Sequence, residues 1–210
     1  MIDKIVTHSK TVLSIAKEHS WFIGARYTNL RDVATFDKVH FVDIDWKKYD
    51  FERHYQAVKL LKPKYTVAKD WEKANDLKLL LRQANALAKN SEFVIIVPKV
   101  NSLKKKILKL IPEEFMLGYS VPTKYGGTDI ETKYFESRPV HLLGGRPEKQ
   151  RELAKDLNVK SIDCNRFTLD ARYGDYFTGK TFKPHPEGGY KRCLEDSIKN
   201  INEIWNCYGR

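Results

Sequence analysis

The stretch FVIIVPK, residues 93–99, contains five consecutive apolar residues, four of them β-branched, followed by Pro98. A run of this kind is typical of a strand that is buried on both faces. Such strands form parallel sheets that helices cover on both sides. The stretch therefore predicts a parallel sheet and an α/β fold.

Six further runs rich in β-forming residues surround this one, and successive runs start about 19 to 29 residues apart. That spacing suits one strand, one helix and their loops. The runs are WFIGARY (21–27), HFVDID (40–45), KYTVAKD (64–70), FMLGYSVP (115–122), PVHLLGG (139–145) and VKSIDCN (159–165). Segments between them, such as residues 72–89 and 190–205, place apolar residues at helical spacing. We expect the first 19 residues to form an opening helix.

Seven strand–helix units in a chain of 210 residues leave two architectures, a doubly wound open sheet and a (β/α) barrel. A complete eight-unit barrel typically has about 250 residues, so this one would be compact. We predict a TIM-like (β/α) barrel of seven to eight parallel strands, formed by residues 1–210 as one domain. Both architectures bind ligands at the carboxyl ends of their strands.

The composition excludes several classes of protein. Apolar residues make up 41% of the chain and aromatic residues 12%, which is enough for a core, and no stretch of about 18 apolar residues predicts a membrane span. Three distant cysteines do not make a disulfide framework, and the amino terminus lacks the apolar part of a secretory signal. The 38 basic and 27 acidic residues give a net charge of +11. We therefore expect a cytoplasmic globular protein with a polyanionic partner.

Two aspartates, Asp70 and Asp163, each follow an expected strand and precede a turn. Facing carboxylates at a barrel mouth suit glycosyl transfer, because one can attack an anomeric carbon while the other moves a proton to or from the leaving group. Either aspartate could instead cap the following helix or pair with a basic residue. The glycosyl hypothesis requires both carboxylates to face one cavity.

Other residues near the strand ends carry weaker signals. The pair Gly144-Gly145 lets a ligand approach the backbone or simply forms a tight turn. Cys164 is more typical of the core than of a nucleophile, and His141 is interpreted as a core or supporting histidine. The chain has no dinucleotide-binding or Walker A glycine motif and no paired cysteine–histidine spacing, so we predict no metal site and no cofactor.

Basic residues follow Asp163 closely. Arg166, Arg172 and Lys180 are interleaved with aromatic residues that include Tyr173. Positive charge suits phosphates and aromatic rings suit bases, so the combination predicts a nucleic-acid surface beside a reaction site. The lysines within residues 104–109 are most simply a solvated helix face.

The segment Pro139–Gly179 resembles the carboxyl-terminal barrel segment of the tRNA-guanine transglycosylases. In that family a strand with a glycine turn is followed by a strand ending in an aspartate–cysteine element, an arginine-rich loop and an aromatic–threonine element. Here these pieces are PVHLLGG, SIDC, NRFTLDARYGD and YFTG. Upstream, ERHYQAVKLLKPKYTVAKDWE (52–72) resembles the helix and strand that lead to the family's first essential aspartate. The resemblance covers residues 43–179 as a pattern of order and spacing.

The resemblance implies a set of roles. Asp163 would be the nucleophile that attacks the glycosidic carbon and expels guanine, and Asp70 would be the general acid/base. The deazaguanine pocket would be lined by Gly118, Tyr119, Gly144 and Gly145, with Trp71 packing on the base, and Arg166 and Arg172 would hold the nucleic-acid backbone. The base would be exchanged with retention, through a covalent glycosyl-enzyme intermediate.

The sequence departs from the enzymes that act on tRNA. Residues 180–190 contain no cysteine, so the zinc site that follows the YFTG element in those enzymes is missing. The glutamine expected near Pro98-Lys99 and a second glycine beside Gly118 are replaced. These departures favour the DpdA-type enzymes of phages and bacteria, which insert 7-deazaguanine derivatives into DNA. The predicted partners are DNA and a free 7-deazaguanine base, and the target guanine would be flipped out of the duplex.

Three alternatives stay open at this point. The chain could act on tRNA, it could be a non-catalytic barrel that binds nucleic acid, or it could be a barrel enzyme for a small phosphorylated or glycosidic metabolite. Binding to a phosphate backbone would weaken steeply as salt rises, which separates the nucleic-acid hypotheses from the last one.

Overall fold

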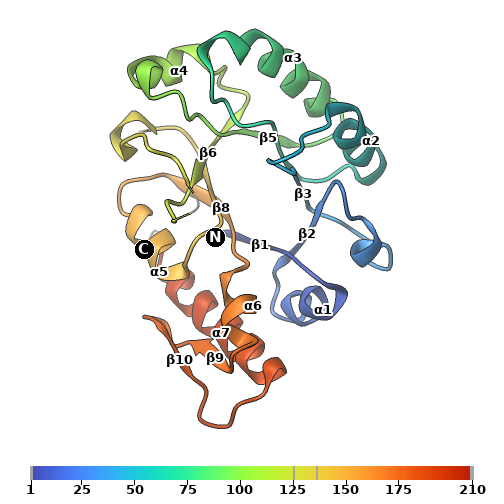
Figure 1. The fold of residues 1–210 in the computed structure, drawn as a ribbon, viewed down its shortest axis with the longest axis vertical. Helices are drawn as coiled ribbons and strands as arrows, with labels where there is room; N and C mark the ends of the chain where they lie inside the picture. Colours follow the sequence, from blue (N-terminus) through green and yellow to red (C-terminus); the bar gives the residue numbers. More distant parts are fainter. Residues whose placement is uncertain (1, 125, 136, 209–210) are drawn as a thin grey trace.

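The computed structural model describes residues 2–124, 126–135 and 137–208. At its centre lies a closed barrel of eight parallel strands in chain order (Figure 1). The strands are β1 (Asp3–Thr7), β2 (Phe22–Arg26), β3 (Phe41–Asp43), β4 (Tyr65–Val67), β5 (Phe93–Ile96), β6 (Met116–Ser120), β7 (Val140–Leu143) and β8 (Val159–Asp163). β1 pairs with both β2 and β8, which closes the sheet. The prediction of a TIM-like barrel is confirmed.

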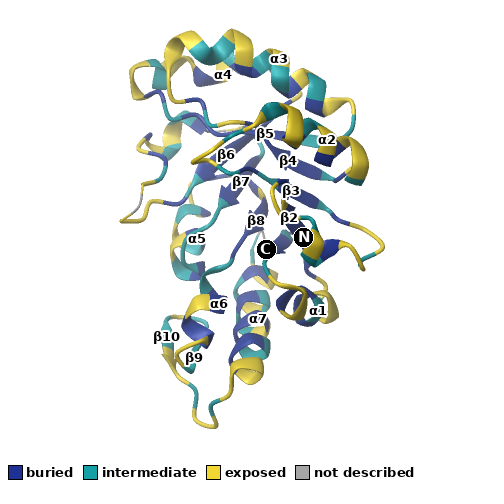
Figure 2. Cartoon of the chain, turned by 45° about the vertical axis from the view of Figure 1, so that its right-hand side comes forward, coloured by how far each residue is buried: buried dark blue, intermediate teal, exposed yellow. Residues whose placement is uncertain are grey.

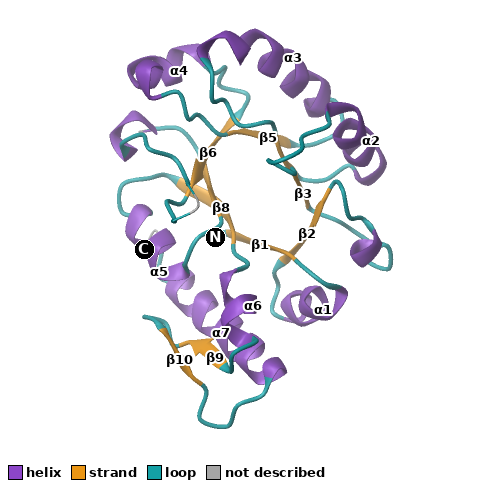
Figure 3. Ribbon diagram, viewed as in Figure 1, coloured by secondary structure: helices purple, strands orange, loops and turns teal. Residues whose placement is uncertain are grey.

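Helices follow most of the strands and surround the barrel (Figure 3). They are α1 (Lys10–Glu18), α2 (Phe51–Leu61), α3 (Leu77–Ala88), the single turn α4 (Ile107–Leu110), α5 (Pro147–Leu153), α6 (Arg166–Ala171) and α7 (Tyr190–Asn206). Each longer helix buries the apolar stripe expected from its spacing, such as Leu80, Ala84 and Leu87 of α3. No helix among the described residues is long and apolar enough to cross a membrane.

The expectation of one opening helix over the first 19 residues is wrong. Residues 3–7 form β1, and Ser9, in an extended conformation, separates this strand from α1. The strand is short and its Ile5 and Val6 are both fully buried, because the barrel interior covers one face and helices cover the other. The apolar residues at the start of the chain therefore supply the eighth strand. This strand fills the gap between β2 and β8 and closes the barrel.

The register of the strands determines which side chains reach the mouth. Side chains two residues apart in a strand point to the same face. His141 pairs with Ser161, and the ring of His141 stacks on Phe41 at 5.4 Å within the barrel. Asp163 and Asp43 each lie two residues beyond an inward-facing side chain, so both carboxylates reach the carboxyl-terminal mouth.

The last part of the chain forms a lobe beside the barrel. Strands β9 (Asp175–Phe177) and β10 (Phe182–Pro184) make an antiparallel hairpin that lies outside the ring of barrel strands (Figure 1). We call this hairpin, with α6 and α7, the hairpin lobe. α7 packs against α1, α5, α6 and β9, and its buried residues face inward in Figure 2. The three cysteines of the chain are free.

Candidate active site

A cavity of about 500 Å³ lies at the carboxyl ends of the barrel strands. The predicted aspartates Asp70 and Asp163 both line it, as do Gly144 and Gly145. Asp43, at the end of β3, lines it as well. The mouth thus brings together three aspartates, from β3, β8 and the loop after β4, and Glu72 of that loop also lines the cavity.

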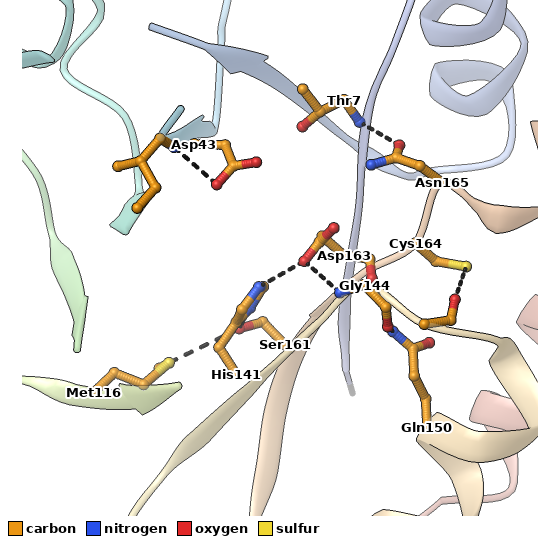
Figure 4. Close-up of polar contacts among 12 residues, drawn as sticks. Thr7, Asp43, Met116, His141, Gly144, Gln150, Ser161, Asp163, Cys164 and Asn165 are labelled. Carbon is orange, nitrogen blue, oxygen red and sulfur yellow. Dashed lines mark hydrogen bonds and ion pairs between the residues drawn. The ribbon is translucent and has the colours of Figure 1, made fainter. Parts of the chain in front are cut away.

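Asp163 is held by one of its two carboxylate oxygens (Figure 4). Oδ1 accepts the backbone N–H of Gly144 at 3.0 Å and lies 3.3 Å from Nε2 of His141. Among the residues that the structure describes, none hydrogen-bonds to Oδ2. The side chain is only 11% exposed. One oxygen is therefore anchored, and the other is left for a ligand.

The backbone around Asp163 is fixed by a buried glutamine. Gln150 Nε2 donates to the carbonyl oxygens of both Gly144 and Asp163, each at 2.8 Å. Gly144 and Gly145 have φ values of +61° and +81°, which glycine adopts without the steric penalty of a side chain. This turn places the N–H of Gly144 over the carboxylate of Asp163.

Asp43 is a cavity-lining carboxyl group that the sequence interpretation missed. Its Oδ1 accepts only the N–H of Ile44, at 2.8 Å. The pKa of Asp43 is raised to about 7, mainly by burial and then by the negative charge of Asp163. The positive charge of Arg26 lowers this pKa and partly offsets the rise. Asp43 stands at the end of an expected strand, like Asp70 and Asp163, and only its closeness to Asp163 distinguishes it.

Asp70 lies in a different electrostatic environment. Its Oδ2 is 2.6 Å from Nζ of Lys99, and both side chains are largely buried. Burial raises the pKa of Asp70, and the hydrogen bond and charge of Lys99 partly offset that rise. Asp70 and Lys99 together present an acceptor and a donor to the cavity.

Three residues predicted to contact the base do not line the cavity. Trp71 is fully buried, and its Nε1 donates to the carbonyl oxygen of Lys73. The hydroxyl of Tyr119 donates to the carbonyl oxygen of Ile130, and its ring packs on Phe135. Gly118 faces the barrel interior, where a Cβ would lie 2.7–2.9 Å from the side chains of Ile95, Val97 and Leu143. These residues support the barrel instead, because Tyr119 and Trp71 point away from the mouth and Gly118 lies beneath it.

An aromatic residue on the neighbouring loop does reach the cavity. Trp46 lines it and is 65% exposed, with Nζ of Lys47 5.3 Å from the ring centre. The loop is held by Tyr27, whose hydroxyl donates to the carbonyl oxygen of Lys48 and accepts the N–H of Asp50. A tryptophan three residues after a strand-end aspartate was the available sequence signal.

The predicted basic residues lie in the hairpin lobe and do not line the cavity. Arg166 donates to both carboxylate oxygens of Asp170, at 2.6 and 2.9 Å. Arg172 and Lys180 are exposed. Tyr173, next to Arg172, is 80% exposed. Arg172 and Lys180 are therefore available to a large ligand that extends beyond the mouth.

No group of three or more described histidine, cysteine or acidic side chains is arranged to hold a metal ion. Comparison with known families gives one finding: a family model described as "Family of unknown function (DUF6610)" matches residues 16–206. No curated protein matches the chain.

Proposed function

The chain belongs to the DUF6610 family, and we propose that it is a nucleic-acid guanine transglycosylase that exchanges guanine in DNA for a 7-deazaguanine derivative. The observation that carries this proposal is the pairing of Asp163 with Asp43 in one cavity, in environments that differ. A retaining double displacement requires one carboxylate that attacks and one carboxyl group that exchanges a proton, and the raised pKa of Asp43 suits the second role.

In the first step Oδ2 of Asp163 attacks C1′ of the target nucleotide, and the bond from C1′ to N9 of guanine breaks. The departing guanine takes a proton from a carboxylic acid of the site. In the second step the incoming deazaguanine gives its N9 proton back to that carboxylate, and N9 attacks C1′ and releases Asp163. Two inversions give retention, and the site ends in its original protonation state.

The sequence resemblance assigned the acid/base role to Asp70, but Asp43 suits that role better. A group with a pKa of about 7 can both give and take a proton at neutral pH. Asp70 is paired with Lys99 at 2.6 Å. We therefore assign Asp70 to recognition, because the N1–H and 2-amino group of guanine are donors that suit a carboxylate.

The surroundings of the cavity suit a polynucleotide. The chain carries a net charge of +11, which attracts phosphates. Trp46 offers an exposed aromatic face at the rim, and takes the stacking role that the sequence assigned to Trp71. A target base must leave the helical stack to enter a cavity of about 500 Å³, and such a base gains from stacking on an aromatic ring. DNA is favoured over tRNA because residues 180–190 lack the cysteines of the tRNA-type zinc site.

The experiment incubates the protein with guanine-containing DNA and a radiolabelled 7-deazaguanine base, and measures label in the DNA. We expect incorporation with the parent protein and none with Asp163→Ala. A parallel reaction with tRNA tests the alternative substrate. Absence of incorporation into either nucleic acid, across several deazaguanine bases, would refute the proposal.

A further inference from the structure

We infer that His141 is a positioning residue that anchors Oδ1 of Asp163 and leaves Oδ2 directed toward the ligand. The inference rests on the proposed function, and it assigns a role to a buried histidine that does not line the cavity. The hydrogen bonds of His141 and the unequal numbers of donors that Asp43 and Asp163 receive support this role.

The hydrogen-bond partners determine where the ring proton of His141 resides. Nε2 faces Oδ1 of Asp163 at 3.3 Å, and Nδ1 lies 2.8 Å from Oγ of Ser161. A carboxylate can only accept, so Nε2 must carry a hydrogen. When Nε2 carries the single ring hydrogen, Nδ1 accepts from the hydroxyl of Ser161, whose other acceptor, Sδ of Met116, lies 3.9 Å away and accepts only weakly. Ser161 therefore selects the tautomer that can donate to Asp163.

The donors around the two carboxyl groups are unequal. Asp163 receives two N–H donors, from Gly144 and His141, and both bind Oδ1. Asp43 receives one, from Ile44. Hydrogen-bond donors favour the ionised form of the carboxyl group that accepts them. The raised pKa of Asp43 therefore belongs to the carboxyl group that receives fewer donors.

Other charges at the mouth act on both groups. Arg26 lines the cavity beside Asp43, and the Asp70–Lys99 pair lines it as well, with the charge of Asp70 adding to the rise in the pKa of Asp43. On the barrel side, His141 lies between the rings of Phe41 and Tyr65, at 5.4 and 6.4 Å. His141 is thus the one titratable side chain that hydrogen-bonds to Asp163 among the described residues.

The first experiment compares His141→Leu, which removes the donor, with His141→Gln, which keeps an N–H donor on a neutral side chain. We expect kcat of the leucine variant to fall about 100-fold while KM for DNA changes little, because only the reacting carboxylate is misplaced. The glutamine variant should recover most of that loss.

The pH dependence of kcat gives a second readout. In the leucine variant the acidic limb of the pH–kcat profile should move up by about one pH unit. The basic limb should move down, so the profile becomes narrower.

A matched control is available in the hairpin lobe. His185 Nε2 lies 3.0 Å from Oδ2 of Asp196, so His185→Gln alters a histidine–aspartate pair of the same kind away from the cavity. It should leave kcat and both pH limbs unchanged. An unshifted pH profile in His141→Leu, or equal loss in the leucine and glutamine variants, overturns the inference.

A second experiment needs no activity and separates this inference from the proposed function. In protein labelled with ¹⁵N-histidine, NMR should show His141 as the Nε2–H tautomer, identified by the signal lost in His141→Gln. Ser161→Ala should weaken that preference. A parent protein that transfers no base but shows the Nε2–H tautomer contradicts the proposed function alone. An Nδ1–H tautomer in the parent contradicts the positioning role even if the enzyme is active.

Discussion

Two histidine–aspartate pairs occur in this molecule, one at the barrel mouth and one in the hairpin lobe. In both, Nε2 faces a carboxylate, at 3.3 Å for His141–Asp163 and 3.0 Å for His185–Asp196. In the lobe, Nδ1 of His185 accepts the N–H groups of Glu187 and Gly188, and the second oxygen of Asp196 accepts from Lys199. In the mouth, Oδ2 of Asp163 receives no hydrogen bond from the described residues. The lobe pair is satisfied by local hydrogen bonds, whereas the mouth pair leaves one carboxylate oxygen facing the cavity without a partner among the described residues.

The carboxyl groups of the two regions also differ in what their charge does to stability. The hydrogen bond from His185 lowers the pKa of Asp196, so the folded state favours its charge. Burial and the neighbouring Asp163 raise the pKa of Asp43 to about 7, so the folded state disfavours its charge. The mouth thus keeps an arrangement that lowers the stability of the fold, which is typical of sites built for reaction.

The largest difference between the two pairs should be seen in turnover. Asp163→Asn removes the nucleophile but can keep the hydrogen bonds around it, so we expect base exchange to fall by at least about 10⁴-fold. Asp196→Asn should leave the rate within about twofold of the parent value, because the lobe pair lies away from the cavity. Denaturing gels of the protein mixed with labelled DNA should show a covalent adduct for the parent and for Asp196→Asn only. An adduct with Asp163→Asn would move the nucleophile to another residue.

Asp43→Asn should have opposite effects on activity and stability. Loss of the acid/base group should lower kcat by about 10²- to 10⁴-fold. The folded pKa of Asp43, about 7, exceeds the value of about 3.9 expected in the unfolded chain, so the folded state binds more protons between those values. The parent therefore loses stability as pH rises from about 4 to about 7, and the variant should be more stable above pH 7, by about 2 kcal/mol after allowance for partial exposure.

The control for that stability effect is Asp196→Asn, for which the sign is reversed. The lowered pKa of Asp196 contributes stability that is present above the unfolded pKa and is lost as pH falls through the folded pKa. Its side chain is 38% exposed, so the variant should lose less than about 1 kcal/mol at pH 7. Urea denaturation at pH 4 and pH 8 measures both variants. A destabilised Asp43→Asn at pH 8 would contradict the raised pKa of Asp43.

Glycines of the two regions offer a smaller contrast. Gly145 at the mouth and Gly179 in the lobe have φ values of +81° and +88°, so alanine is strained at either position. A Cβ on Gly145 would lie 2.4 Å from Cγ1 of Val121, whereas one on Gly179 would meet only Ile204, at 4.0 Å. We expect Gly145→Ala to lose about 2–4 kcal/mol and Gly179→Ala about 1–2 kcal/mol in urea denaturation. Equal losses would show that the contact with Val121 relaxes freely.

The barrel could be predicted because its strands are marked by local pattern. The run at residues 93–99 and its six neighbours are apolar, evenly spaced and separated by helical segments. β1 could not be predicted in this way, because its five residues lie just before the apolar residues of α1 in the sequence. Only the short break that contains Ser9 separates the strand from the helix. The pairing of β1 with β8 joins residues 158 positions apart, such as Asp3 and Ser161, which no local pattern encodes.

The site could be predicted in part, for the same reason. Asp70, Asp163, Gly144 and Gly145 reach the cavity because strand ends of a barrel meet at one mouth. The direction of an individual side chain depends on strand register, so Trp71 and Tyr119 were assigned to the cavity although both are buried elsewhere. Asp43 acquires its raised pKa from burial and from Asp163, which lies 120 residues later in the chain and approaches it only in the folded barrel.

The smallest expected effect concerns the exposed basic residues of the lobe, and it tests whether the lobe takes part in the function of the mouth. Arg172 and Lys180 are both exposed. Arg172 lies near His8, just beyond β1: the pKa of His8 is lowered mainly by burial and also by the positive charge of Arg172. If DNA that enters the mouth also crosses the lobe, the double change Arg172→Ala and Lys180→Ala should weaken binding a few-fold and reduce the salt slope by about 1–2. A matched control changes Lys105 and Lys109 to alanine, because these exposed lysines lie near α4, away from the lobe. Fluorescence anisotropy with labelled DNA over a range of salt concentrations measures both variants. Equal slopes for the two double variants would mean that the lobe contributes only general charge, and that specific contacts with DNA are confined to the barrel mouth.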